Sequence, residues 1–342
     1  MPMRVDPNQE DTMLSTRTTL ARFLALILLL ALAGLAQAQG FTRKDVTIRS
    51  EGLDLAAWYY TPKGLKPDEK RPAIVMAHGF SAPKEALLQN FADRFAQAGF
   101  VVVVFDYRFL GASGGEPRGQ IFPTQQIEDY RNAITWTQLQ KEVDPARIGI
   151  WGTSYSGAHV LHLGAFDRRV KAVVSQVMLV DGPANAARLN RADVLPNVGA
   201  FLAGDRAQRY TEGKVNYLPV VGPEGSPSAL PTPESYEFFT KVVQPNAPRW
   251  ENRVTLESME KFLEYTPGAN IQRISPTPLL MVVASDDRLT PTDLAVEAYE
   301  RAREPKKLVL FRGGHFDAYT EPGLNTTAGE ATSWFRQWLM TK

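Results

Sequence analysis

Short runs of apolar residues recur along most of the chain, and helical patterns separate them. Each run is continuous rather than alternating, which is typical of strands buried on both faces of a parallel sheet. Their alternation with helices predicts an α/β fold with a doubly wound, mostly parallel sheet, preceded by an antiparallel hairpin. The hairpin is expected at residues 45–48 and 55–60, the buried strands at residues 73–77, 101–105, 147–151, 170–177, 279–284 and 308–311, and the helices at residues 84–98, 125–141, 155–165, 292–303 and 326–340.

One long stretch, residues 181–275, interrupts this alternation. It has no buried-strand pattern and is rich in proline, with aromatic residues at 236–239 and Trp250. A stretch of this length within a compact domain usually has a function or a structure of its own. We therefore expect a partly helical cap or lid, inserted into an α/β core of residues 39–180 and 276–342, and we expect the aromatic residues of this cap to form mainly its own small core. A mobile surface excursion is the alternative.

The N-terminus has the pattern of a targeting segment. Residues 23–36 form an apolar run behind two arginines, and residues 36–38 supply a small-x-small cleavage pattern. The run is shorter than the roughly 20 apolar residues that span a bilayer. We expect residues 1–38 to be a cleaved signal peptide, with Met13 as an alternative start. The mature protein is then exported, to the periplasm or the medium in a bacterium, with no stable membrane insertion.

Composition excludes several classes of function. Lys and Arg total 38 against 37 Asp and Glu, so the net charge is only +1 and does not predict a positively charged surface for nucleic acid. The absence of cysteine excludes disulfides, thiolate metal sites and a cysteine nucleophile. Imidazole chemistry is limited to His78, His159, His162 and His315. The i, i+3 spacing of His159 and His162 could suit a metal, but no matching ligand pair exists, so we expect packing roles and no metal or cofactor.

A strand, a tight turn and a helix are expected across residues 147–157. The turn presents Ser154 between small residues, which projects the hydroxyl above the sheet edge and makes it the candidate nucleophile. The amide of Tyr155, at the start of the helix, is a candidate oxyanion donor. An ordinary turn serine is the alternative reading, and Ser156 is the rival hydroxyl. A serine nucleophile needs an imidazole base that a carboxylate orients.

Two later strands supply such groups where each strand ends. Asp287 follows the strand at residues 279–284, and His315 follows the last strand. Open α/β sheets build their sites at the carboxyl ends of strands. The chain order serine, aspartate, histidine is also the order of nucleophile, acid and base in α/β hydrolases. Asp286 competes for the acid role, and Asp181 is a weaker alternative.

From about Asp45 to its C-terminus, the chain resembles the α/β-hydrolase superfamily, and within it the dienelactone-hydrolase-like and peptidase-S15-like serine esterases. The resemblance implies Ser154 as nucleophile, His315 as base and Asp287 as acid, with the amides of Phe80 and Tyr155 as the oxyanion hole. It rests on His78-Gly79-Phe80, the stretch from Asp106 to Gly114, the Gly-Thr-Ser-Tyr-Ser-Gly turn, Asp287 four residues before Pro291, and Gly313-Gly314-His315.

The chain departs from this family pattern in two places. Ser156 stands where glycine is commoner, as in a variant of S15-like enzymes. The C-terminal β-sandwich usual in S15-like proteins is missing from this sequence, which makes a proline-directed peptidase less expected. His78 is expected to brace the oxyanion loop, and Asp106, Arg108 and Gly111 to form a structural turn.

Together these residues predict an exported serine hydrolase that cleaves a small-molecule carboxylic ester or thioester through an acyl-enzyme, without a cofactor. An S15-like peptidase or acyltransferase is the first alternative, because the same triad serves amides and acceptors other than water. A non-catalytic binding protein for an apolar ligand is the second. The sequence carries no signal of the acyl group, the alcohol or the oligomeric state.

Overall fold

The computed structural model describes residues 40–190, 193 and 195–340. The predicted signal peptide, residues 1–38, lies outside these described residues. Within the part of the chain that is described, no helix is long and apolar enough to cross a membrane.

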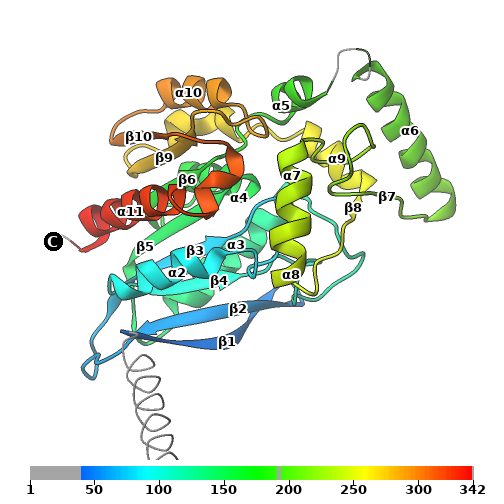
Figure 1. Cartoon of the computed structure of the whole chain (residues 1–342). Helices are drawn as coiled ribbons and strands as arrows, with labels where there is room; N and C mark the ends of the chain where they lie inside the picture. The colour runs from blue at the N-terminus through cyan, green and yellow to red at the C-terminus, as the bar shows by residue number, and fades with distance from the viewer. Residues whose placement is uncertain (1–39, 191–192, 194, 341–342) are drawn as a thin grey trace, which may run out of the picture.

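An eight-stranded sheet forms the centre of the molecule (Figure 1). Its strand order is β1-β2-β4-β3-β5-β6-β9-β10, and the neighbours from β4 to β10 pair in parallel. The β1-β2 hairpin adds an antiparallel edge, so the predicted α/β fold is confirmed. The strands are β1 (Phe41–Ser50), β2 (Leu53–Pro62), β3 (Arg71–Ala77), β4 (Val101–Phe105), β5 (Val143–Thr153), β6 (Val170–Gln176), β9 (Leu279–Ala284) and β10 (Lys306–Phe311).

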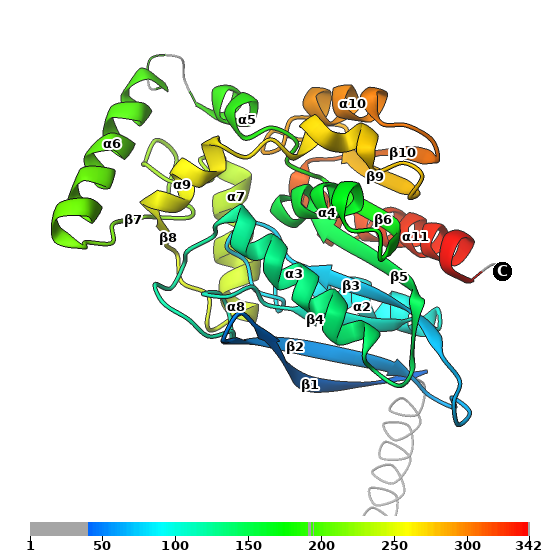
Figure 2. The same cartoon turned by 180° about the vertical axis from the view of Figure 1, so that it is seen from behind.

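Helices cover both faces of the sheet, as a doubly wound fold requires. Figures 1 and 2 show α2 and α11 on one face and α3, α4 and α10 on the other. Every side chain of β4 and β9 is buried, which explains their continuous apolar sequences. The helices are α2 (Leu88–Gln97), α3 (Pro123–Gln138), α4 (Tyr155–Phe166), α10 (Thr292–Arg301) and α11 (Gly323–Phe335), the last followed by a π-helical turn (Arg336–Met340).

The helix predicted to begin at Lys84 begins instead at Leu88. Asp106, which follows β4, accepts hydrogen bonds from the backbone amide and the ammonium group of Lys84, both at 2.7 Å. These bonds hold the segment before the helix as a loop, and Leu87 closes that loop with a φ of +65°. The prediction was wrong here because the tertiary contact overrides the helical pattern of the sequence.

An insertion between β6 and β9, residues 181–275, lies at one end of the sheet, with α6 on its outer side (Figures 1 and 2). It is mainly helical, but it also contains a small antiparallel pair, β7-β8, that its sequence did not indicate. Its elements are α5 (Gly182–Leu189), α6 (Leu195–Glu212), β7 (Tyr217–Leu218), α7 (Pro233–Phe238), a π-helical turn (Phe239–Val243), α8 (Gln244–Asn246), β8 (Val254–Thr255), α9 (Leu256–Leu263) and a 3-10 helix (Pro267–Arg273).

Candidate active site

Ser154 occupies a sharp turn between β5 and α4. Its φ of 57° and ψ of −114° lie in a region that L-residues rarely adopt, which is the strained geometry of a nucleophile elbow. A Cβ at Gly152 would collide with the carbonyl oxygen of Ser156, so the turn requires glycine at this position. The elbow therefore places the Ser154 hydroxyl at the carboxyl edge of the sheet.

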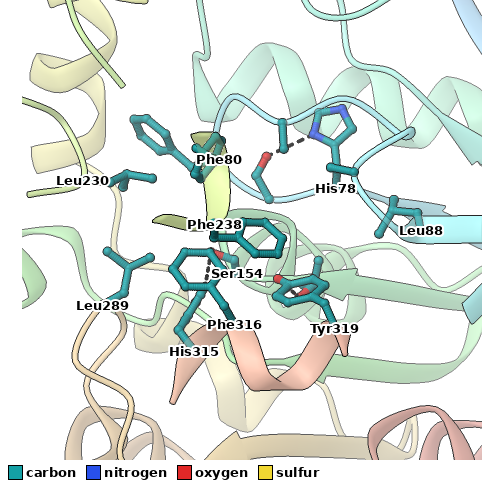
Figure 3. A pocket seen from close by; sticks show the side chains of 15 residues that line it. His78, Phe80, Leu88, Ser154, Leu230, Phe238, Leu289, His315, Phe316 and Tyr319 are labelled. Atoms are coloured by element: carbon teal, nitrogen blue, oxygen red, sulfur yellow. Dashed lines mark hydrogen bonds between the residues drawn. The ribbon is translucent and has the colours of Figure 1, made fainter. Parts of the chain in front are cut away.

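Three residues from distant parts of the sequence meet at this edge. The Nε2 atom of His315 lies 3.1 Å from the Oγ of Ser154, and its Nδ1 atom lies 2.8 Å from the Oδ2 of Asp287. His315 begins a 3-10 helix (His315–Tyr319) after β10, and Asp287 lies in the turn after β9. All three side chains are at most 8% exposed, and Figure 3 shows the bond between Ser154 and His315. Hydroxyl, imidazole and carboxylate thus form one continuous hydrogen-bonded chain.

The turn after β9 holds the Asp287 carboxylate in a fixed orientation. Its Oδ1 accepts hydrogen bonds from the amides of Leu289, at 2.9 Å, and Thr290, at 2.8 Å. The Thr290 hydroxyl lies 3.0 Å from Oδ2 of Asp287 and 3.1 Å from Nδ1 of His315. Sequence reasoning did not single out Thr290, although it lies inside the motif that links Asp287 to Pro291.

The rival residues have other partners. Asp286 is exposed and accepts a hydrogen bond from the Ser285 hydroxyl at 2.6 Å. Asp181 caps α5 by accepting the Ala184 amide at 2.8 Å. Ser156 is fully buried and bonds the Tyr107 hydroxyl at 2.5 Å. Of these candidates, the described contacts bring only Asp287 to the imidazole of His315.

The two predicted oxyanion donors belong to two separate segments next to Ser154. Tyr155 is the first residue of α4, and Phe80 follows β3 in the loop that we call the oxyanion loop, residues 78–87. Neither amide has a hydrogen-bond partner within the described part of the chain. A Cβ at Gly79 would approach the Cβ of Ser154 to 2.9 Å, so the oxyanion loop packs directly on the elbow. Both amides are free to donate to an oxygen bound beside Ser154.

Buried polar groups hold the oxyanion loop in place. His78 donates from Nδ1 to the carbonyl of Gly79 at 3.0 Å, and burial lowers the pKa of its imidazole, so the ring is neutral. Burial also opposes the charge of Lys84, but the neighbouring Asp106 and Glu85 carboxylates outweigh it and raise the pKa of the ammonium group. The expected bracing role of His78 is consistent with these contacts. The contribution of Lys84 was not foreseen.

A cavity of about 30 Å³ adjoins Ser154 and is mostly apolar. Two of its aromatic residues, Phe238 and Phe239, come from the insertion. They pack on each other, and Phe239 packs on Trp250, as expected of a small core within the insertion, so these aromatics both form that core and line the cavity. The Phe238 ring stacks on Phe316 with centroids 4.4 Å apart (Figure 3). The lining residues are His78, Gly79, Phe80, Ala82, Ala86, Leu88, Thr153, Ser154, Leu230, Phe238, Phe239, Leu289, His315, Phe316 and Tyr319.

His159 packs in the protein core. Its Nδ1 lies 2.9 Å from the Tyr265 hydroxyl and its Nε2 lies 2.9 Å from the side-chain oxygen of Gln126. Burial, assisted by the charges of His162 and His78, lowers the pKa of His159 to about 3. Because the ring of His159 is buried and both of its nitrogens have protein partners, the structure agrees with the predicted packing role.

This sheet order, with a serine elbow and a histidine at the carboxyl edge, defines a serine hydrolase of the α/β-hydrolase superfamily. The chain belongs to the family described as X-Pro dipeptidyl-peptidase (S15 family), whose sequence model matches residues 51–317. The resemblance inferred from the sequence motifs is thereby confirmed.

Similar proteins include a polyketide transferase, a thiohydrolase and a quorum-quenching protein. The polyketide transferase grgF of Penicillium sp is 33% identical over 82% of this chain and 92% of its own length. The thiohydrolase aneE of Aspergillus aculeatus is 32% identical over 70% of this chain and 77% of its own length. The quorum-quenching protein AidA of Acinetobacter baumannii is 31% identical over 80% of this chain and 88% of its own length.

Solved structures agree with this assignment. The α/β hydrolase GrgF from Penicillium sp. sh18 superposes with a TM-score of 0.75 at 29% identity, covering 88% of this chain and all of the other. DcsB, solved with a substrate analogue, gives a TM-score of 0.77 at 26% identity with the same coverage.

Proposed function

We propose that this serine hydrolase cleaves carboxylic esters or thioesters through an acyl-enzyme on Ser154. The observation that carries the proposal is the hydrogen-bonded chain from Ser154 Oγ through His315 to Asp287, with spacings of 3.1 and 2.8 Å. Such a chain is what converts a weakly nucleophilic hydroxyl into an attacking group.

Each group has a defined part in the proposed reaction. His315 Nε2 takes the proton as Ser154 Oγ attacks the carbonyl carbon, and then returns it to the leaving alcohol or thiol. Asp287 orients the ring and stabilises the imidazolium. The amides of Phe80 and Tyr155 donate to the tetrahedral oxyanion. Water, activated by the same imidazole, then releases the acid.

The cavity supports an apolar acyl group as the part of the substrate held beside Ser154. Leucine and phenylalanine side chains predominate in its lining, and none of the described residues that line it is a lysine or an arginine. A relative named thiohydrolase supports a thioester as well as an oxygen ester. We therefore propose small-molecule, apolar acyl esters and thioesters as the substrate class.

The Ser154→Ala variant tests the nucleophile. We expect it to lose turnover of short-chain aryl esters by at least about 10³-fold, and to lose covalent labelling by a fluorophosphonate. Ser156→Ala is the matched control, since it removes the neighbouring hydroxyl and should still be labelled. Labelling of Ser154→Ala at the wild-type rate would mean that another residue is the nucleophile.

Acyl transfer is the second candidate activity, and a relative named polyketide transferase favours it. A transferase differs from a hydrolase in the group that attacks the acyl-enzyme, which an alcohol can do in place of water. Product analysis with added alcohols separates the two, because a transferase forms a new ester in preference to the free acid. Amide substrates in the same panel test peptidase activity, which the family description favours.

We also propose that residues 1–38 direct export and are removed. The support is the apolar run at residues 23–36 and the small-x-small pattern that follows it. N-terminal sequencing of the protein recovered from the cell envelope or medium tests this, with residue 39 as the expected first residue. A cytoplasmic chain that retains residues 23–36 would contradict it.

A further inference from the structure

A carboxylate of the insertion lies next to the proposed catalytic histidine. Glu234 is in the first turn of α7, one helical turn before Phe238, so both residues lie on one side of the helix. Phe238 stacks on Phe316, which directly follows His315. The Oε2 atom of Glu234 lies 3.8 Å from the point where a Cβ of Gly314, the residue before His315, would be.

The Glu234 carboxyl has no protein partner that explains its position. Its Oε1 atom is buried and forms no hydrogen bond with any described residue. Burial raises the pKa of this carboxyl. The charge that His315 carries when protonated and the charge of Arg288 oppose that rise, whereas Asp287 and Asp317 add to it. A buried acceptor without a partner reduces stability, so its presence beside the active site points to a functional role.

We propose that Glu234 is a positioning residue for catalysis, whose carboxylate acts through space on His315 and stabilises the imidazolium that forms when Ser154 loses its proton. This inference rests on the proposed function. An opposite charge nearby favours the protonated ring, and in a partly desolvated site that attraction is weakly screened. Because Glu234 belongs to the insertion, the strength of the base depends on how closely α7 packs on His315.

Fluorophosphonate labelling tests this without knowledge of the natural substrate. The second-order labelling rate would be measured from pH 5 to pH 9 for wild type, Glu234→Gln and Glu237→Gln. Glu237 is the matched control, because it removes the same charge from the same helix at an exposed position paired with Lys241. Thermal unfolding of each variant shows that the fold is retained.

We expect Glu234→Gln to be labelled about threefold more slowly on the alkaline plateau, because a charge interaction that shifts the pKa of the ring by half a unit changes the stability of the imidazolium by that factor. The acid limb of its profile, where the labelling rate falls as His315 becomes protonated, should lie about half a pH unit lower than in wild type. The reason is that the imidazole of His315 loses a nearby negative charge that favours its protonation. Glu237→Gln should match wild type. Glu234→Asp keeps the charge and should keep the wild-type acid limb, even if its shorter side chain slows labelling.

Several outcomes would overturn the inference. The inference is wrong if Glu234→Gln has the same labelling rate and the same acid limb as wild type. It is also wrong if Glu234→Gln is labelled more slowly but its acid limb does not move, because Glu234 would then only shape the pocket. An acid limb in Glu234→Asp equal to that of Glu234→Gln would also refute it. These results are distinguishable from failure of the proposed function, in which wild type itself is not labelled.

Discussion

The buried ion pair between Lys84 and Asp106 permits a quantitative prediction about Asp106→Asn. The Asp106 carboxylate is fully buried and accepts hydrogen bonds from the Lys84 amide, the Lys84 ammonium and the Ala112 amide, at 2.7, 2.7 and 3.0 Å. Asparagine has one acceptor oxygen, so its NH₂ group must face one of these donors. Breaking a buried pair costs about 3–5 kcal/mol, and an unsatisfied buried amide costs about 1–3 kcal/mol.

Lys84 keeps a second carboxylate, Glu85, at 3.0 Å, which favours the low end of that range. We therefore expect Asp106→Asn to lose about 4 kcal/mol of unfolding free energy, equivalent to about 6 °C in melting temperature for a protein of this size. The assay is thermal unfolding followed by circular dichroism. Asp54→Asn is the matched control, because Asp54 pairs with Arg49 at 2.6 Å where both side chains are more than half exposed, and such pairs contribute about 0–1 kcal/mol. Equal melting temperatures for the two variants would refute the reasoning.

Two further predictions concern pH and the pocket. Burial holds the pKa of His159 at about 3, whereas a histidine in the unfolded chain titrates near 6.5, so the unfolded state binds a proton first as pH falls. Urea unfolding should show a loss of stability between pH 7 and pH 5 that is about 2 kcal/mol smaller in His159→Gln than in wild type, and an equal loss in both proteins would contradict this. Phe238→Ala should raise the ratio of kcat/KM for an eight-carbon acyl ester to kcat/KM for a two-carbon one by about tenfold. Tyr236→Ala, which changes an exposed residue of the same helix, should leave this ratio unchanged. An unchanged chain-length preference in Phe238→Ala would show that Phe238 does not limit the pocket.

The sequence predicted the sheet and the residues at its carboxyl edge because both depend on local pattern. β4 and β9 have the bounds predicted for them, since every residue in them is apolar and the next residues are polar or turn-forming. Ser154 directly follows β5, Asp287 lies three residues after the end of β9, and His315 lies four residues after the end of β10. In a parallel sheet the strand ends meet at one edge, so locating the strands is enough to bring these side chains together.

Residues that depend on contacts between distant segments could not be located in this way. Nothing near Lys84 in the sequence indicates that Asp106 binds it, so a helical pattern was extended into the oxyanion loop. Glu234 and Phe238 lie in the insertion, whose sequence is rich in proline and has no buried-strand pattern from which the direction of α7 could be predicted. Their approach to His315 results from the packing of α7 on the 3-10 helix after β10, which no local pattern encodes.

The size of the cavity links the insertion to the choice of substrate. A cavity of about 30 Å³ is smaller than an acyl chain, so we expect an entering acyl group to displace aromatic side chains such as Phe238. Separating Phe238 from Phe316 removes a stacked contact that stabilises the protein by about 0.5–1.5 kcal/mol, in addition to the free energy gained by burying apolar area. An apolar acyl chain that takes the place of the ring buries the apolar lining of the cavity again. A charged acyl chain does not cover this lining with apolar surface, and its charged group must also give up its water. Selectivity for apolar acyl groups is therefore expected from displacement of the insertion, without any residue that recognises a particular acyl chain.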